Sequence, residues 1–179
     1  MTVEPEFFRP VAIADLEEGE NVVTIEADAG EREALARRFG LFSLDRLAAT
    51  LRVSVEDGDA LLRLRGRLVA DVTQACVVTL EPVRSHLESP FEGLYSRSAR
   101  AQAADEIELG EAEAPEPISA GVIDLGEVTA EQLALELNPF PRAEGVEFKG
   151  FSTDAEGPGE GKEAAGPFAA LERLKGKKG

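Results

Sequence analysis

Apolar and polar residues alternate over much of the middle of the chain, which is the pattern of β-strands with one buried face. The alternation is clearest over residues 60–80, where one face is apolar and the other is mainly charged. The apolar face holds Leu62, Leu64, Leu68, Ala70 and Val72, and the other face holds Arg63, Arg65, Arg67, Asp71 and Thr73. Similar patterns predict strands over 21–27, 44–55 and 83–95, after a first extended segment over 7–13.

Short connections between these segments predict antiparallel pairing of consecutive strands. Asp57 and Gly58 form a strong hairpin signal between two alternating runs. The run 60–80 would reach roughly 70 Å at ~3.3 Å per residue, which is longer than a domain of this size is wide. It must therefore bend or break. Gly66 is a candidate for a bulge, and residues 73–76 are the favoured break, before a further apolar strand segment at 76–82.

Two helices are predicted from their capping residues. Asp28 stands three residues before Glu31, the spacing of a capping box, and Gly40 supplies a left-handed C-terminal position, so the first helix is expected over 29–39. Asp124 and Glu127 repeat that spacing before a second helix. Thr129 with Gln132 offers an alternative start for it. Asn138–Pro139 and Pro141 end this helix.

Together these elements predict an α+β fold, with a curved antiparallel sheet of about five or six strands and two packed helices. Whether the curve is open or barrel-like is left undecided. One domain is expected over 1–148, and it contains an acidic mobile linker at 99–118, where alanine, glutamate and proline dominate. A flexible tether is expected over 149–166. A short helix is expected over 167–175, on the C-terminal side of the tether.

Charge is distributed unevenly along the 179 residues, whose net charge is −16. Residues 1–30 hold eight acids and one base, and residues 103–147 hold twelve acids and one base. The middle, 31–102, is nearly neutral, and all its bases are arginines. An acidic surface attracts basic partners and repels nucleic acid, so coating of DNA or RNA is disfavoured.

Residues that often carry catalysis are isolated in this sequence. His86 is the single histidine, and we interpret it as a surface strand residue. Cys76 is the single cysteine, and we interpret it as a small buried side chain in an apolar strand. The stretch 157–161 lacks the Lys-Ser/Thr pair of a phosphate loop. We therefore expect no enzyme activity, no cofactor and no metal site.

Two features remain as candidate contact sites. Arg63, Arg65 and Arg67 form a ladder on one strand face, with Arg52 and Arg84 as candidates to lie nearby, and three guanidinium groups suit RNA phosphates. The favoured alternative for this ladder is a solvated face or pairing with acids of the same chain. The second feature is the stripe of Phe168, Leu171 and Leu174, for which docking on this domain and docking on a partner are equally favoured.

The sequence also bears on localisation. No run of eighteen apolar residues is present, so no membrane-spanning helix is expected. Residues 1–10 contain Glu4 and Glu6 where a signal peptide would carry Lys or Arg. We expect a cytoplasmic protein that binds neither membrane nor DNA.

Four segments together resemble the YceD family of bacterial proteins, which are named for accumulation of large-subunit ribosomal RNA. They are Ala36–Leu41, Cys76–Pro82, Ile123–Arg142 and Pro167–Lys175. Some members carry a second cysteine where this chain has Thr79, so a zinc site at Cys76 is not supported. The resemblance implies a cytoplasmic, non-enzymatic role in the synthesis, processing or stability of 23S ribosomal RNA.

The leading hypothesis for function is therefore a ribosome biogenesis factor that contacts a basic ribosomal protein or a pre-50S particle, and reaches ribosomal RNA directly or indirectly. The alternative is direct RNA binding through the arginine ladder. The oligomeric state is left open.

Overall fold

The structure is a computed structural model that describes residues 5–17, 19–56, 61–96, 115–118 and 120–146. These residues belong to one compact unit, Met1–Val146. The expected hairpin tip at 57–60, most of the linker, the tether and the C-terminal helix lie outside the described residues. Of the expected linker, the described part includes the strand β6, Glu116–Pro117.

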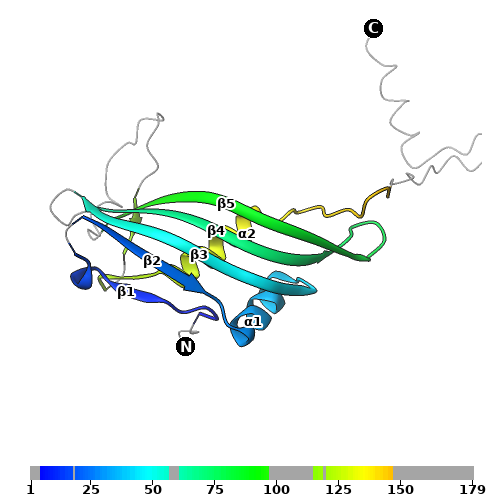
Figure 1. Cartoon of the computed structure of the whole chain (residues 1–179), viewed down its shortest axis with the longest axis horizontal. Helices are drawn as coiled ribbons and strands as arrows, with labels where there is room; N and C mark the ends of the chain where they lie inside the picture. The colour runs from blue at the N-terminus through cyan, green and yellow to red at the C-terminus, as the bar shows by residue number, and fades with distance from the viewer. Residues whose placement is uncertain (1–4, 18, 57–60, 97–114, 119, 147–179) are drawn as a thin grey trace, which may run out of the picture. The chain divides into compact units, whose positions relative to one another are not determined.

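A five-stranded sheet dominates the fold, in the order β2-β3-β4-β5-β6. Its strands are β2 (Glu20–Glu26), β3 (Ser43–Glu56), β4 (Leu61–Ala75), β5 (Pro82–Ser96) and β6. Pairing is antiparallel from β2 to β5, and β6 joins β5 in parallel. The sheet is curved but does not close into a barrel, because β2 and β6 end the strand order (Figure 1).

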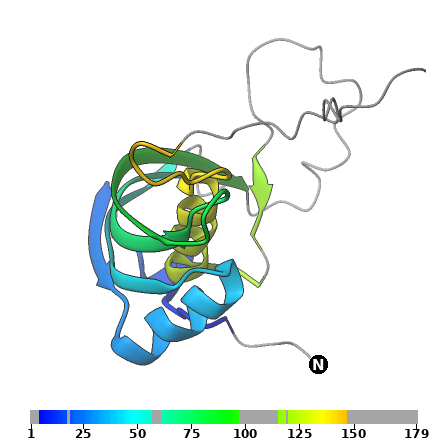
Figure 2. The ribbon, with the colours of Figure 1, turned by 90° about the vertical axis from the view of Figure 1, so that its right-hand side faces the viewer.

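The remaining elements cover the concave side. They are β1 (Pro10–Ala12), a 3₁₀ helix (Ile13–Asp15), α1 (Ala29–Phe39), β7 (Val122–Asp124) and α2 (Leu125–Glu136). Strands β1 and β7 pair antiparallel as a separate two-stranded sheet. Figure 2 shows the large sheet curving around α2. The other face of the sheet carries no helix in the described residues, and we call it the outer face.

Burial confirms the alternation predicted from the sequence. The five residues of the predicted apolar face of β4 are 0–2% exposed and belong to the same core cluster as residues of α2 and β3. The side chains that are fully enclosed there include Leu47, Leu51, Val53, Leu64, Leu68, Leu125 and Leu133. Their removal from water is the main stabilising term of the domain.

The helix caps are also confirmed. The Glu31 N–H donates to Asp28 Oδ1 over 2.9 Å, and the Asp28 N–H donates back to Glu31 Oε2 over 2.7 Å. Gly40 adopts φ 65° at the end of α1. Helix α2 starts after Asp124, and Thr129 lies inside it, with its hydroxyl donating to the Leu125 carbonyl. The alternative start at Thr129 is therefore not used.

Two local predictions about the long run 60–80 had different outcomes. The break near 73–76 is confirmed, because β4 ends at Ala75 and a turn follows. The bulge at Gly66 is wrong: pairing is continuous there, and the irregularity lies in β3 between Leu44 and Arg46. Gly66 instead leaves room for the ring of Phe91, its cross-strand neighbour, which a Cβ atom would overlap.

Candidate functional site

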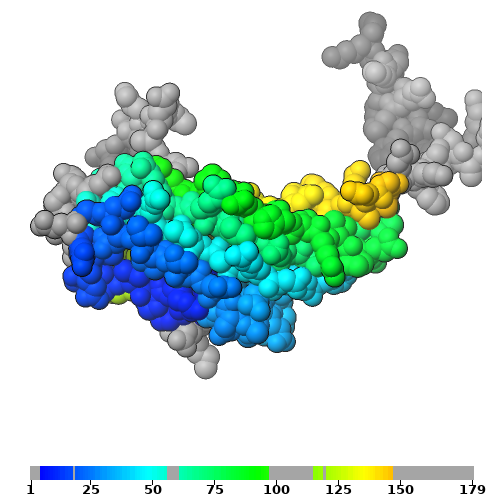
Figure 3. Space-filling model, in the orientation of Figure 1, coloured from blue at the N-terminus to red at the C-terminus, as the bar shows by residue number. Residues whose placement is uncertain are grey.

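Three of the segments that resemble the YceD family meet at one end of the sheet. A groove of about 380 Å³ lies between them. Ala36–Leu41 contributes Phe39 and Gly40, the turn after β4 contributes Val77, and the chain at the end of α2 contributes Leu137, Asn138, Pro139 and Pro141. In Figure 3 the orange atoms that follow α2 lie against green atoms of the β4–β5 end. The fold thus unites segments that are far apart in the sequence.

Hydrogen bonds fix these segments to one another. The Val77 N–H donates to the Pro141 carbonyl over 2.8 Å, and Gln74 Nε2 donates to the Asn138 carbonyl over 2.9 Å. On the other side of β4, the Phe42 N–H donates to the Thr73 carbonyl over 2.8 Å. Two of these three bonds join backbone groups, and the third uses the side-chain amide of Gln74.

Large apolar side chains are exposed in the same segments. Of the eight such side chains among the described residues, five lie in these segments or directly next to them in the sequence, and we call these five the end surface. They are Phe42, Val77, Leu80, Leu135 and Phe140, with 58%, 47%, 72%, 76% and 69% of their surface exposed. A concentration of exposed apolar side chains on a protein surface is typical of a contact site.

Leu80 has an unusual backbone conformation within the end surface. Its φ is 62°, in the left-handed region that disfavours a residue with a bulky side chain. The turn holds it there, because the Leu80 N–H donates to the Cys76 carbonyl and the Cys76 N–H donates to the Glu81 carbonyl. Strain of this kind costs about 1–3 kcal/mol and concentrates at functional positions.

Cys76 lies inside this turn rather than in a strand, so the predicted strand over 76–82 is wrong. Its side chain has no exposed surface, which confirms the prediction of a small buried residue. The N–H groups of Thr79 and Ala143 donate to Sγ over 3.4 and 3.5 Å. The Thr79 side chain, followed by the N–H groups of Ala143, Thr79 and Val78, lowers the pKa of the thiol to about 6.

Substitution of Cys76 should affect stability and its pH dependence. Cys76→Ala should lower the free energy of unfolding by about 1 kcal/mol through lost packing. The pKa of this thiol is lower in the folded protein than its ordinary value of 9.0. The thiolate therefore contributes its full stabilisation above pH 9.0, and this contribution is lost as the pH falls through about 6. Urea unfolding across this range should therefore show a rise in stability with pH in the wild type.

The same rise should be reduced in Cys76→Ala and in Cys76→Ser, since neither side chain ionises there. Equal pH dependence in all three proteins would contradict a stabilising thiolate. Stoichiometric zinc that is lost on substitution would contradict a purely structural cysteine.

The arginine ladder lies on the outer face of the sheet, as predicted, and each member contacts a carboxylate of β5. Arg63 and Arg65 both contact Glu92 over 3.0 Å, and Arg67 contacts Glu88 over 2.8 Å. Arg65 lowers the pKa of Glu92, and Arg67 lowers that of Glu88, chiefly through these hydrogen bonds. Each arginine of the ladder therefore has a partner within the sheet, with two carboxylates shared among three guanidinium groups.

The two arginines considered as neighbours of the ladder differ in position. Arg52 is the cross-strand partner of Arg65 and does lie beside it. Arg84 pairs with Thr73, toward the other end of β4, and does not join the ladder. His86 is an exposed strand residue as predicted, and its Nδ1 lies 2.6 Å from Asp71 Oδ1, a partner that the sequence did not reveal.

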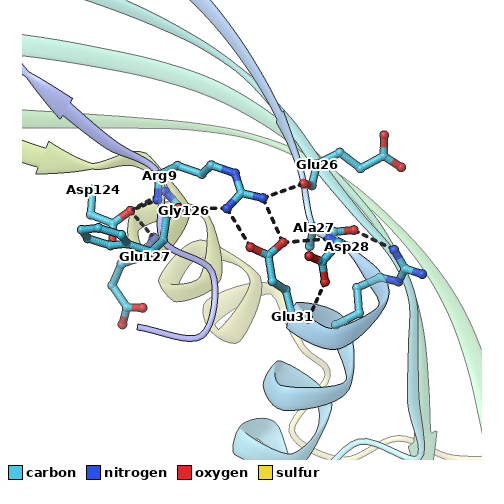
Figure 4. A network of polar contacts seen from close by, with 10 residues as sticks. Arg9, Glu26, Ala27, Asp28, Glu31, Asp124, Gly126 and Glu127 are labelled. Carbon is cyan, nitrogen blue, oxygen red and sulfur yellow. Dashed lines mark hydrogen bonds and ion pairs between the residues drawn. The ribbon is translucent and has the colours of Figure 1, made fainter. Parts of the chain in front are cut away.

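A polar network on the concave side was not predicted at all (Figure 4). Arg9 donates two hydrogen bonds to Glu31, over 2.7 and 2.9 Å, and its N–H donates to Asp124 Oδ1 over 2.8 Å. Its guanidinium also lies 4.7 Å from the centre of the Phe7 ring. The network joins the N-terminal segment to both helices, so its role is structural. A weak signal existed, because Arg9 is the single base among residues 1–30.

The structure also bears on metal ligands and on membrane-spanning helices. Among the described residues, no three His, Cys, Asp or Glu side chains group as metal ligands. No helix in that part of the chain is long and apolar enough to cross a membrane. The candidate docking residues Phe168, Leu171 and Leu174 lie outside the described residues.

Comparison with known proteins gives one match. A family model described as "Large ribosomal RNA subunit accumulation protein YceD" matches residues 64–175. No curated protein and no solved structure matches the chain. The matched region includes most of β4, all of β5 and α2, and the turn around Cys76.

Proposed function

The chain belongs to the YceD family, since the matched residues make up more than half of it, and we propose on that premise that it is a ribosome biogenesis factor for 23S ribosomal RNA. The family description concerns accumulation of large-subunit ribosomal RNA. We propose that this chain acts in the cytoplasm by binding, not by catalysis. Its proposed partner is a basic ribosomal protein, free or in a pre-50S particle.

The observation that carries this choice of partner is the pairing of the arginine ladder. An RNA phosphate at Arg65 or Arg67 would have to displace Glu92 or Glu88, and the carboxylate would remain beside the phosphate. The repulsion between these two anions would offset much of the new contact. The net charge of −16 adds a long-range repulsion.

The acidic surface favours a protein partner by the same physics. Residues 103–147 include twelve acids and one base. Within the described part of that range, Glu131 has its pKa raised by burial and by the neighbouring Glu127 and Glu116. A basic protein approaching this side would relieve the repulsion among these carboxylates, which raises the rate of encounter.

A salt titration separates the proposed function from direct RNA binding. RNA-free proteins extracted from large ribosomal subunits should bind the chain, with an affinity that falls steeply as salt is added. Naked 23S RNA should bind weakly even at low salt. Changing Arg63, Arg65 and Arg67 to Ser should leave protein binding nearly unchanged, because these side chains are already paired with carboxylates of β5.

Direct RNA binding through the arginine ladder predicts a different result. Tight binding of naked 23S RNA that is lost in the triple Ser variant would favour the alternative. The salt slope would then fall by about one unit for each lost phosphate contact.

A further inference from the structure

We propose that the end surface is where the basic partner docks, and that Leu80 is its principal anchor. This inference rests on the proposed function, because it assigns a contact surface to the partner proposed there. It commits to a basic protein that presents an apolar contact surface, rather than to RNA or to a second copy of this chain.

Leu80 carries the first part of the argument. With 72% of its surface exposed, its side chain contributes little to the core. At φ 62° it also occupies a conformation that Gly or Asn would adopt at lower cost. An exposed apolar side chain at a strained position is unfavourable for the isolated domain on both counts, so a contact outside the domain accounts for it best.

The surroundings of Leu80 suit a preorganised contact. Backbone hydrogen bonds hold the turn at both ends, through Cys76 to Glu81 and through Val77 to Pro141. The same turn lines the groove of about 380 Å³ through Val77, and most of the other lining residues are apolar, with Gln74 and Asn138 as the polar side chains. That volume lies at the small end of binding pockets and accommodates apolar side chains of a partner. Little conformational entropy is then lost when the partner binds.

The distribution of charge favours a basic protein over RNA or a second copy of the chain as the occupant of the end surface. The segments 36–42, 76–82 and 134–144 carry three bases and three acids, so the end surface is balanced and offers no basic site for phosphates. A second copy would bring another −16 charge to the contact. A basic protein is attracted by the acidic residues around α2 and meets exposed apolar side chains without net charge at the end.

Photocrosslinking tests the location directly in the full chain. A benzoylphenylalanine is placed at position 140 on the end surface, or at position 22 as a control, since Val22 is 61% exposed on β2. The probe is the RNA-free protein fraction of the large subunit, with and without added 23S RNA. We expect position 140 to crosslink to one basic protein and position 22 to give none.

Crosslinks from position 140 to RNA or to a second copy of the chain would overturn the proposal. Equal crosslinking to the basic protein from both positions would also overturn it. If the wild-type chain binds no large-subunit protein at all, both the docking surface and the proposed function fail. If it binds one but position 140 gives no crosslink to it, only the docking surface fails.

A matched substitution tests the anchor. Leu80→Asn removes the apolar side chain and suits the left-handed backbone, so thermal stability should be unchanged or higher. Affinity for the crosslinked protein should fall at least about tenfold, as for a central contact residue. Val22→Asn should bind as the wild type, and Leu80→Met should retain most of the affinity. Wild-type affinity of Leu80→Asn would overturn the role of Leu80.

Discussion

Replacement of Gly126 by Ala should destabilise the domain by about 3 kcal/mol, a value at the upper end for overpacking. A Cβ atom at this position would overlap the carbonyl oxygen of Phe7 and approach the Arg9 N–H to 3.2 Å. Both contacts are with backbone, which cannot rotate away as a side chain can. The N-terminal segment would have to leave the first turn of α2.

That displacement would break several interactions at once. Phe7 is 0% exposed, and its ring would lose its packing. The Leu125 N–H donates to the Arg9 carbonyl over 3.0 Å, and the Arg9 N–H donates to Asp124 (Figure 4). A buried backbone group that loses its partner costs about 1–3 kcal/mol. The expected destabilisation therefore combines lost packing of the Phe7 ring with lost hydrogen bonds of the backbone.

The chain offers a matched control in Gly30. It occupies the second position of α1, as Gly126 does in α2. A Cβ atom at Gly30 would meet only Asp28 Oδ1, at 3.4 Å. Gly30→Ala should therefore be neutral or stabilising, by up to about 1 kcal/mol. Urea unfolding followed by circular dichroism measures both. A Gly126→Ala variant as stable as Gly30→Ala would show that the close approach of Phe7 does not matter.

Local patterns were sufficient to predict most of the fold. Alternation identified the strands because one face of each packs on the core, and Leu64 and Leu68 are fully buried as expected. The caps at Asp28 and Asp124 were predicted because capping involves residues within one turn. Both signals involve residues that are close together in the chain, so the sequence alone is enough to recognise them.

Features that depend on tertiary register were not predicted. The partners of Arg65 and Arg67 follow from the pairing of β4 with β5, which sets Arg65 opposite Glu92. The turn after Ala75 joins these two strands, and its residues were predicted to form a strand. The same error hid the environment of Cys76, whose Sγ accepts from Ala143, 67 residues away.

The end surface shows a further limit of sequence patterns. Its members come from three segments, and none of them stands out in its own segment, because a single exposed leucine or phenylalanine is common on a protein surface. Phe140 stands among prolines that were interpreted as a helix stop. Only the fold brings these segments to one end of the sheet, where their exposure can be recognised as shared.

In cells that make this protein, the double substitution Leu80→Asn with Phe140→Ser should lower 23S RNA as strongly as removal of the protein. If each side chain is a central contact worth about 2 kcal/mol, their joint loss weakens binding several-hundred-fold or more. We expect a loss of that size to leave the partner largely unbound in the cell. The ratio of 23S to 16S RNA, measured on total RNA, should then match that of the deletion strain.

The triple change of Arg63, Arg65 and Arg67 to Ser supplies the opposing variant, because it alters the outer face and leaves the end surface intact. It should keep the ratio near that of the wild type. All variants should be compared at equal protein levels, measured by immunoblot. This control matters since a destabilised chain is degraded and would lower 23S RNA for a different reason. A normal ratio in the double variant together with a low ratio in the triple variant would move the functional surface from the end of the sheet to its outer face.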